Sequence, residues 1–293
     1  AQSYTVTDGV NVIGAEAFRG ANHLKEITLP STLTQLEPYA FAWCHGLTDI
    51  TIPDSVTSIE GYAFEDCNNL IKIKLSNNIT TIEERTFIGC NRLTSITLPD
   101  NITTIKAHAF DGCSSLTDVT IPNSVTSIGN NAFYECSRLM RVTLSNSIMT
   151  LAANIFNGCN NLAAITIPDS VTTIEEAAFA GCSSLKAVDL SEKLTDIGRE
   201  AFLNCTGLSE ILLPDTVTMI GAAAFSGCSG VNKVKLSANL TEIGKEVFLN
   251  CENLTEIVIP AGVTVIGDGA FNGCHKAAYI TIPAGVTTIG KEA

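Results

Sequence analysis

The twelve phenylalanines of the chain recur every 23 residues, and this period constrains the fold more than any other feature. The series runs from Phe18 to Phe271 without an insertion or deletion. The eleven cysteines follow the same period three residues later, from Cys44 to Cys274, and the first repeat carries Ala21 in that position. A period of about 20 to 50 residues is typical of units that bury their apolar faces only by stacking on one another. The sequence therefore predicts a solenoid.

We expect residues 1–293 to form a single repeat domain of about 12.5 repeats. An ordinary core would split a chain of this length into two domains, but a solenoid grows in one dimension. No linker, charge block or change of composition marks a boundary. The chain begins and stops inside a repeat, without polar capping sequences, which solenoids need at their ends. This predicts a fragment without terminal caps and leaves end-to-end self-association open.

The charge and hydropathy patterns exclude several classes of partner. A net charge of −13 disfavours binding to nucleic acid, which requires a dense basic face. No apolar run approaches the roughly 18 residues that span a bilayer, so we expect no membrane insertion. The first residues show no signal peptide, although one could have been removed or lie outside this fragment.

The cysteine column predicts buried, reduced thiols. Side chains in register on stacked strands point the same way and lie about 4.8 Å apart, whereas a disulfide needs Cβ atoms about 3.8 Å apart with converging directions. Structural zinc requires clustered ligands, and no two cysteines are closer than 23 residues. We therefore predict neither disulfides, nor a metal site, nor a cofactor.

One repeat, Phe110–Ala132, has the sequence FDGCSSLTDVTIPNSVTSIGNNA and divides into three segments. Alternating apolar residues predict a short half-buried strand over residues 116–121, which stacking would extend into a parallel sheet. Residues 125–128 predict a second short extended segment. Residues 129–136 place Ala132, Phe133 and Cys136 on one face of a short helical turn. The predicted class is an α/β repeat.

The pattern L-x-x-I-x-I/L resembles the leucine-rich repeat, and with a preceding A-F-x-x-C it resembles the BspA-like class of that family. The resemblance covers the whole chain and implies a right-handed solenoid. The position after the strand where the general repeat usually carries asparagine or cysteine varies here, with Ser55, Asn78, Asn101, Ser124, Lys193 and Gly262 among its residues, so we expect no asparagine ladder. Members of the BspA-like class are known as secreted or surface-attached proteins. The resemblance implies an extracellular or cell-surface adhesion module that binds host matrix proteins or other cells.

No pattern indicates catalysis. The four histidines, His23, His45, His108 and His275, are scattered over several repeats, and a catalytic triad needs its members within hydrogen-bond reach. We therefore predict that the chain is not an enzyme. Two alternatives to adhesion remain. One is a structural spacer that displays other domains, and the other is ice binding through two columns of threonines, although Lys74 and Asp189 interrupt the first of them.

Two sets of residues are candidates for contact with a protein partner. Exposed positions of the predicted helical turn carry large aromatic and basic side chains in successive repeats, a composition typical of interface hot spots, although isolated exposed aromatics without a role remain an alternative. A second set carries charge at outward positions of the predicted strands. The first set is Tyr39, Trp43, Tyr62, Arg85 and His108, and the second is Lys72, Lys74, Arg141, Asp189, Lys233 and Lys235.

Overall fold

A computed structural model describes residues 2–293, so Ala1 and its place in the expected domain lie outside the described residues. The chain divides into an N-terminal unit, Ala1–Ser147, and a C-terminal unit, Ile148–Ala293. Each unit is a parallel β-solenoid, and together the two units hold about 12 turns. One turn of 23 residues is called a rung below.

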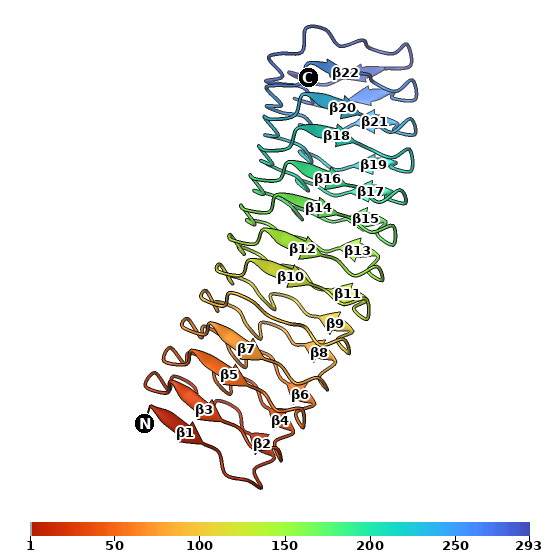
Figure 1. Cartoon of the computed structure of the whole chain (residues 1–293). Helices are drawn as coiled ribbons and strands as arrows, with labels where there is room; N and C mark the ends of the chain where they lie inside the picture. The colour runs from red at the N-terminus through yellow and green to blue at the C-terminus, as the bar shows by residue number, and fades with distance from the viewer. Residues whose placement is uncertain (1) are drawn as a thin grey trace. The chain divides into compact units, whose positions relative to one another are not determined.

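The rungs of the N-terminal unit contribute short strands to two series, drawn side by side in Figure 1, and the rung of residues 95–97 adds only isolated bridges to the first series. The first series is β1 (Ser3–Thr5), β3 (Glu26–Thr28), β5 (Asp49–Thr51), β7 (Lys72–Lys74), β10 (Asp118–Thr120) and β12 (Arg141–Thr143). The second series is β2 (Val12–Ile13), β4 (Gln35–Leu36), β6 (Ser58–Ile59), β8 (Thr81–Ile82), β9 (Thr104–Ile105) and β11 (Ser127–Ile128). The predicted strand and second extended segment of Phe110–Ala132 are thus confirmed as β10 and β11.

The C-terminal unit repeats the same arrangement. Its first series is β14 (Ala164–Thr166), β16 (Ala187–Asp189), β18 (Glu210–Leu212), β20 (Lys233–Lys235) and β22 (Glu256–Ile257). Its second series is β13 (Thr150–Leu151), β15 (Thr173–Ile174), β17 (Asp196–Ile197), β19 (Met219–Ile220), β21 (Glu242–Ile243), β23 (Val265–Ile266) and β24 (Thr288–Ile289).

Strands of neighbouring rungs pair in parallel with equivalent residues aligned. Val119 of β10 lies opposite Val142 of β12, and Thr120 lies opposite Thr143. The central residue of most first-series strands is buried and its two neighbours point outward, as the alternation of a strand requires. The outward side of these strands is called the strand face below.

The core of each unit is built on a column of stacked phenylalanine rings. In the N-terminal unit Phe87 lies between Phe64 and Phe110, with ring centroids 5.6 and 5.4 Å apart. In the C-terminal unit Phe202 lies between Phe179 and Phe225 at 5.1 and 5.3 Å. Ring planes in both sets lie within 10° of parallel. The exact period therefore reflects a requirement that each ring rest on the ring of the adjacent rung.

The cysteines line the core and are bonded to it. Ten of the eleven are buried, Cys274 is half-buried, and none forms a disulfide in the described chain. Their thiols donate to the carbonyl of the phenylalanine in the preceding rung, as Cys67 does to Phe41 at 3.1 Å. Burial raises the pKa of Cys182 to about 12. A protonated thiol at neutral pH is a weak nucleophile, so these residues act as small core side chains with a hydrogen-bond donor.

The predicted helical turn at residues 129–136 is wrong, because the structure contains no helix within residues 2–293. Asn131 and Glu135 adopt left-handed backbone conformations, with φ of 60° and 55°. Equivalent residues of other rungs do the same. A left-handed residue at every fourth position cannot continue a right-handed helix. The segment is a run of consecutive tight turns, and the chain is an all-β solenoid rather than an α/β repeat.

Hydrogen bonds explain why these turns replace a helix. The amide of Ala42 donates to the carbonyl of Tyr39 within the same rung, 3.0 Å away. The amide immediately before it points the other way, because Phe41 donates to the carbonyl of Ala63 in the following rung at 2.8 Å. A helix would direct each of these donors into its own backbone. Here half of these amides donate to an adjacent rung and so tie the rungs together. The surface formed by these turn segments is called the turn face below.

A column of threonines beside the second-series strands links adjacent rungs through hydrogen bonds at the surface. The hydroxyl of Thr195 donates to the carbonyl of Thr172 at 3.0 Å, and Thr103 donates to Thr80 at 3.3 Å. Most hydroxyl groups of this column donate to a carbonyl of the preceding rung at 3.0–3.5 Å. One of the two threonine arrays considered for ice binding therefore presents few free donors.

Four rungs carry serine where the others carry proline after the strand, and these serines are completely buried. The hydroxyl of Ser76 donates to the carbonyl of Val56 at 2.6 Å and accepts from the amide of Asn78 at 3.1 Å. Proline has no amide hydrogen that would need an acceptor here. Serine instead uses its side-chain hydroxyl to form two hydrogen bonds with nearby backbone groups. The equivalent serines are Ser145, Ser191 and Ser237.

We predict that Ser76→Ala lowers the free energy of unfolding by about 1–3 kcal/mol, because it leaves buried backbone groups without partners. Urea denaturation measures the change. Ser55→Ala is the matched control, because the buried hydroxyl of Ser55 has no hydrogen-bond partner among the described residues. That control is expected to change stability by less than about 0.5 kcal/mol. Equal losses in both variants would contradict the assigned role of Ser76.

Candidate protein-interaction site

The turn face positions the first set of candidate residues. In each rung the residue two places before the phenylalanine is left-handed, and φ is 60° at Tyr39, 62° at Tyr62 and 54° at Arg85. The phenylalanine is buried in the core, whereas Tyr39, Tyr62 and Arg85 are half-buried at the surface. The amide of the left-handed residue donates to the next rung, as that of Tyr62 does to Glu84 at 3.1 Å. Side chains of successive rungs are thus held in one column.

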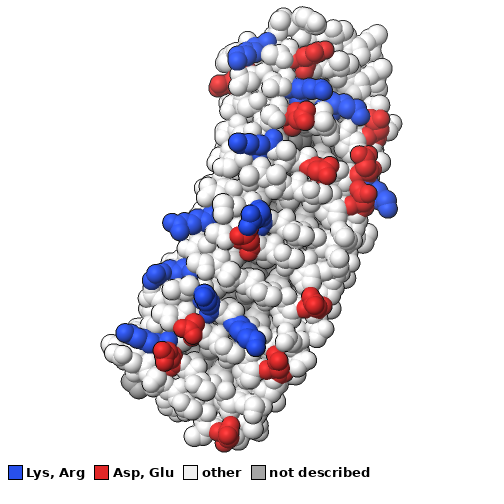
Figure 2. All heavy atoms as spheres, viewed as in Figure 1, with Lys and Arg blue, Asp and Glu red and all other residues white. Residues whose placement is uncertain are grey.

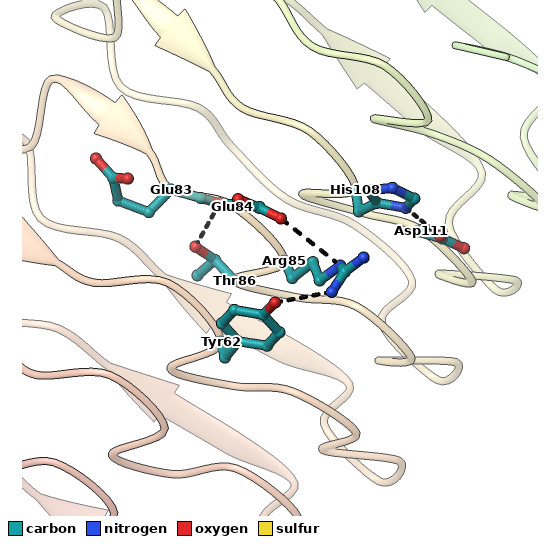
Figure 3. Close-up of polar contacts among 7 residues, drawn as sticks. All are labelled: Tyr62, Glu83, Glu84, Arg85, Thr86, His108 and Asp111. Carbon is teal, nitrogen blue, oxygen red and sulfur yellow. Dashed lines mark hydrogen bonds and ion pairs between the residues drawn. The ribbon is translucent and has the colours of Figure 1, made fainter. Parts of the chain in front are cut away.

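Tyr39, Tyr62 and Arg85 stack directly on one another. The rings of Tyr39 and Tyr62 have centroids 4.6 Å apart and planes inclined by 20°. The guanidinium of Arg85 lies 5.5 Å from the centroid of Tyr62, and its Nη1 donates to the hydroxyl of Tyr62 at 2.7 Å. Figure 3 shows this bond and the neighbouring carboxylate of Glu84, 3.9 Å from Arg85 Nε. The contact combines a cation–π interaction with a hydrogen bond.

Arg19 covers the other end of the stack and joins Trp43 to it. Its guanidinium lies 4.2 Å from the Trp43 ring and 5.4 Å from the Tyr39 ring. Glu16 fixes Arg19 through an ion pair of 2.9 Å. Trp43 remains 41% exposed, although its ring is held in place. The five residues Arg19, Tyr39, Trp43, Tyr62 and Arg85 are called the aromatic ladder.

The members of the aromatic ladder act on each other electrostatically. Partial burial is the main cause of a raised pKa at Tyr39, followed by Tyr62 and Glu65, while Arg19 and Arg85 oppose the change. Its phenol is therefore neutral at physiological pH. Partial burial and the carboxylate of Asp66 also raise the pKa of Glu65, again against the two arginines. The ladder thus carries positive charge at both ends and a neutral aromatic middle.

His108 occupies the same column one rung after Arg85, but it turns toward a different partner. Its Nδ1 lies 2.8 Å from Oδ2 of Asp111, as Figure 3 shows. Of the predicted column, Tyr39, Tyr62 and Arg85 form a continuous stack. His108 does not join this stack and pairs with Asp111 instead.

The second set of candidates lies on the strand faces of the two units. Lys72 and Lys74 belong to β7, and Lys233 and Lys235 belong to β20. Asp189 ends β16, opposite Thr166. These residues share the strand face rather than the turn face that carries the aromatic ladder.

Arg141 of β12 already has a partner on the strand face. Its Nε lies 2.5 Å from Oδ1 of Asp118, across the pair of strands. A hydrogen bond from Thr117, and then Arg141, lower the pKa of Asp118. Arg141 is thus already paired within the unit, although its side chain stays exposed.

No group of three or more histidine, cysteine, aspartate or glutamate side chains within residues 2–293 could hold a metal ion. The same range contains no helix long and apolar enough to cross a membrane. The four histidines lie in separate rungs, as the sequence indicated.

Sequence reasoning missed Arg19 and Glu65 as parts of the site. Arg19 lies one residue after a phenylalanine, in a slot that sequence patterns treat as variable surface. Its role depends on the rung step, which brings this slot next to Trp43 of the following rung. A search for basic residues one repeat and one residue before an exposed aromatic would have found it.

Comparison with known proteins identifies the repeat. The profile described as "BspA type Leucine rich repeat region" matches in six copies over residues 1–117, 103–229 and 195–293. A leucine-rich repeat protein from Bacteroides ovatus ATCC 8483 is 29% identical, with a TM-score of 0.70 over 88% of this chain and 78% of that one. A leucine rich cell surface protein from Faecalibacterium prausnitzii A2-165 is 27% identical, with a TM-score of 0.55 over 100% and 88%.

The pneumococcal vaccine antigen PcpA, 18% identical, has a TM-score of 0.54 over 99% of this chain and 89% of that one, and so shares the fold. Comparison with curated proteins gave no match. The parallel strands and stacked rungs define a leucine-rich-repeat solenoid. The chain belongs to the BspA-type leucine-rich repeat family.

Proposed function

We propose that this chain is a non-enzymatic binding module of the cell surface or extracellular space, which attaches to host matrix proteins or to other cells through the aromatic ladder. Leucine-rich repeat proteins generally mediate protein interactions. The observation that carries the proposal is the stack of Arg19, Tyr39, Tyr62 and Arg85 with Trp43 exposed beside it.

The ladder has the composition and the rigidity of an interface hot spot. Tryptophan, tyrosine and arginine dominate the binding energy of measured interfaces. Stacking and ion pairing already hold these side chains in one arrangement, so a partner loses little side-chain entropy on binding. The Bacteroides ovatus and Faecalibacterium prausnitzii proteins support a bacterial setting, and the second is described as a cell surface protein.

A structural spacer that displays other domains is the alternative function. A spacer needs a rigid stack of rungs but no preorganised aromatic surface. The ladder breaks the repeat at several neighbouring rungs, where other rungs carry glutamate, asparagine or alanine in the same slot. This local departure favours binding over display.

We predict that the full chain binds saturably to at least one member of a panel of immobilised matrix proteins or fixed cells. Trp43→Ala is expected to weaken that binding about tenfold or more, because the exposed indole is the most accessible anchor of the ladder. Surface plasmon resonance or a solid-phase assay measures the affinity, and circular dichroism checks the fold of each variant.

Tyr279→Ala provides the matched control, since Tyr279 is an exposed aromatic of the C-terminal unit outside the ladder. It is expected to bind as the unaltered chain does. Binding that never saturates, or that Trp43→Ala leaves unchanged, would count against the aromatic ladder and in favour of a spacer.

A further inference from the structure

The strand face of the N-terminal unit contains a groove of about 690 Å³ over β5, β7 and residues 95–97. It is called the lysine groove, and the residues that matter are Asp49, Thr51, Lys72, Lys74, Ser95 and Thr97. None of these residues belongs to the aromatic ladder, which lies on the turn face.

The groove lies where the strand pairing changes. Strands β5 and β7 pair over three residues, from Asp49 opposite Lys72 to Thr51 opposite Lys74. The following rung joins this sheet by a single bridge between Lys72 and Ser95. Residues 96 and 97 continue outside any strand. The hollow is therefore built by the backbone and does not depend on one flexible side chain.

Two unpaired ammonium groups face the lysine groove. Lys72 and Lys74 are exposed on either side of buried Ile73, so both point outward from β7. Among residues 2–293 neither side chain forms an ion pair or a hydrogen bond with another side chain. Figure 2 shows basic side chains on this face over the region of β7, in a chain whose net charge is −13.

The neighbours of Lys74 can all donate or accept hydrogen bonds. Thr51 lies opposite Lys74 in the paired strand, and Thr97 holds the same position one rung later. Asp49 is closer to Lys72, and its carboxylate accepts from the hydroxyl of Thr48 at 3.1 Å. Lys74 is thus a free cation between two hydroxyls, which is a suitable environment for a carboxylate.

We propose that the lysine groove binds an extended acidic segment of a partner protein, with carboxylates at alternate positions that contact Lys74 and Lys72. Alternate side chains of an extended peptide point the same way and lie about 6.6–6.8 Å apart. The two lysines have the same spacing, because they are alternate residues of β7. A sulfated glycan fits less well than a peptide with two carboxylates, since the carboxylate of Asp49 repels every additional negative charge of a dense polyanion.

The C-terminal unit contains an internal comparison. Lys233 and Lys235 of β20 line a groove of about 430 Å³ at the same positions of the repeat. Lys233 lies between Glu210 and Glu256 of the paired strands, so carboxylates of the chain already offset its charge. Lys235 is flanked on one side by Leu212. This groove is therefore expected to bind an acidic peptide only slightly more tightly than a neutral one.

The test uses the full chain and an acetylated, rhodamine-labelled peptide with three glutamates alternating with valines, together with its glutamine counterpart. Fluorescence anisotropy is expected to show binding of the glutamate peptide alone, and its affinity should fall as salt rises. Lys74→Thr restores the residue found at this position in the neighbouring rungs, so the fold is kept. It is expected to weaken binding about threefold to tenfold.

Lys235→Thr is the matched control and is expected to leave the affinity for the glutamate peptide unchanged. Equal binding of the two peptides, or an unaltered affinity in Lys74→Thr, would overturn the proposal. So would tighter binding of a heparin oligosaccharide through Lys72 and Lys74, which would make the groove a glycan site.

The lysine groove rests on the proposed function only in that the chain is taken to be a binding module. Binding at the groove and binding at the aromatic ladder can be tested separately. Trp43→Ala is expected to bind the acidic peptide normally, because the lysine groove does not involve the aromatic ladder. Loss of matrix binding in that variant with normal peptide binding would support both sites. Loss of peptide binding in Trp43→Ala would overturn the lysine groove as a separate site.

Discussion

Replacing Phe87 with alanine is expected to lower the free energy of unfolding of the chain by about 3–5 kcal/mol. Phe87 is fully buried, and the rings of Phe64 and Phe110 pack on its two faces. Both neighbours are fixed by their own rungs, so the surroundings cannot collapse into the cavity. Urea denaturation followed by circular dichroism measures the loss, which is the largest we expect from a single substitution.

Phe87→Leu is the matched control. It retains most of the apolar volume at the same position and is expected to cost clearly less than the alanine variant. A loss below about 1 kcal/mol in Phe87→Ala would show that the stacked rings contribute little to the stability of the core.

Gly221→Ala is expected to destabilise the chain by about 1–3 kcal/mol. A Cβ atom at Gly221 would overlap the main-chain nitrogen of Arg199 in the preceding rung. Backbone atoms cannot move aside as a flexible side chain can, so the two rungs must separate. The midpoint of urea denaturation measures the effect.

Gly244 occupies the equivalent position one rung later and provides the control. A Cβ atom there would meet the carbonyl oxygen of Ile220 at 3.6 Å, an ordinary contact, and φ is not in the left-handed region. Gly244→Ala is therefore expected to be neutral or to stabilise the chain by about 0.4–1 kcal/mol. A result in which Gly244→Ala is as harmful as Gly221→Ala would contradict the clash.

The period of Phe and Cys was sufficient to predict the stacked architecture, because identical core positions in successive repeats leave few other ways to bury them. The strand at residues 118–120 and the extended segment at residues 127–128 were also predictable from alternation. The turn segment was not. Spacings of three and four residues, such as those of Ala132, Phe133 and Cys136, fit both a helix and consecutive turns.

A signal against the helix was present in the sequence. The position two residues after the phenylalanine holds glycine in many rungs, including Gly89, Gly112 and Gly181, and asparagine in others, including Asn204. These are the residue types that tolerate a positive φ. The structure places all four in that region. Glycine and asparagine in one column would have predicted a repeated left-handed residue.

The candidate site was predictable in part. The aromatic column from Tyr39 to Arg85 follows from the period alone, because residues one repeat apart lie side by side. Arg19 and the separate pairing of His108 depend on side-chain directions that a linear pattern does not contain. The lysine groove depends on the single bridge between Lys72 and Ser95, a local change in pairing that the residues of that rung do not reveal.

Hydrogen bonds between side chains and the backbone of adjacent rungs join residues 20 to 26 positions apart, so each rung of a unit is tied mainly to its neighbours. Under a pulling force, such a stack would yield one rung at a time. Each event would release a loop of 23 residues, or about 76–83 Å of extended chain, and lower the tension before the next rung opens. In the adhesion role proposed above, the chain would thereby lengthen in steps and dissipate the load before it detaches.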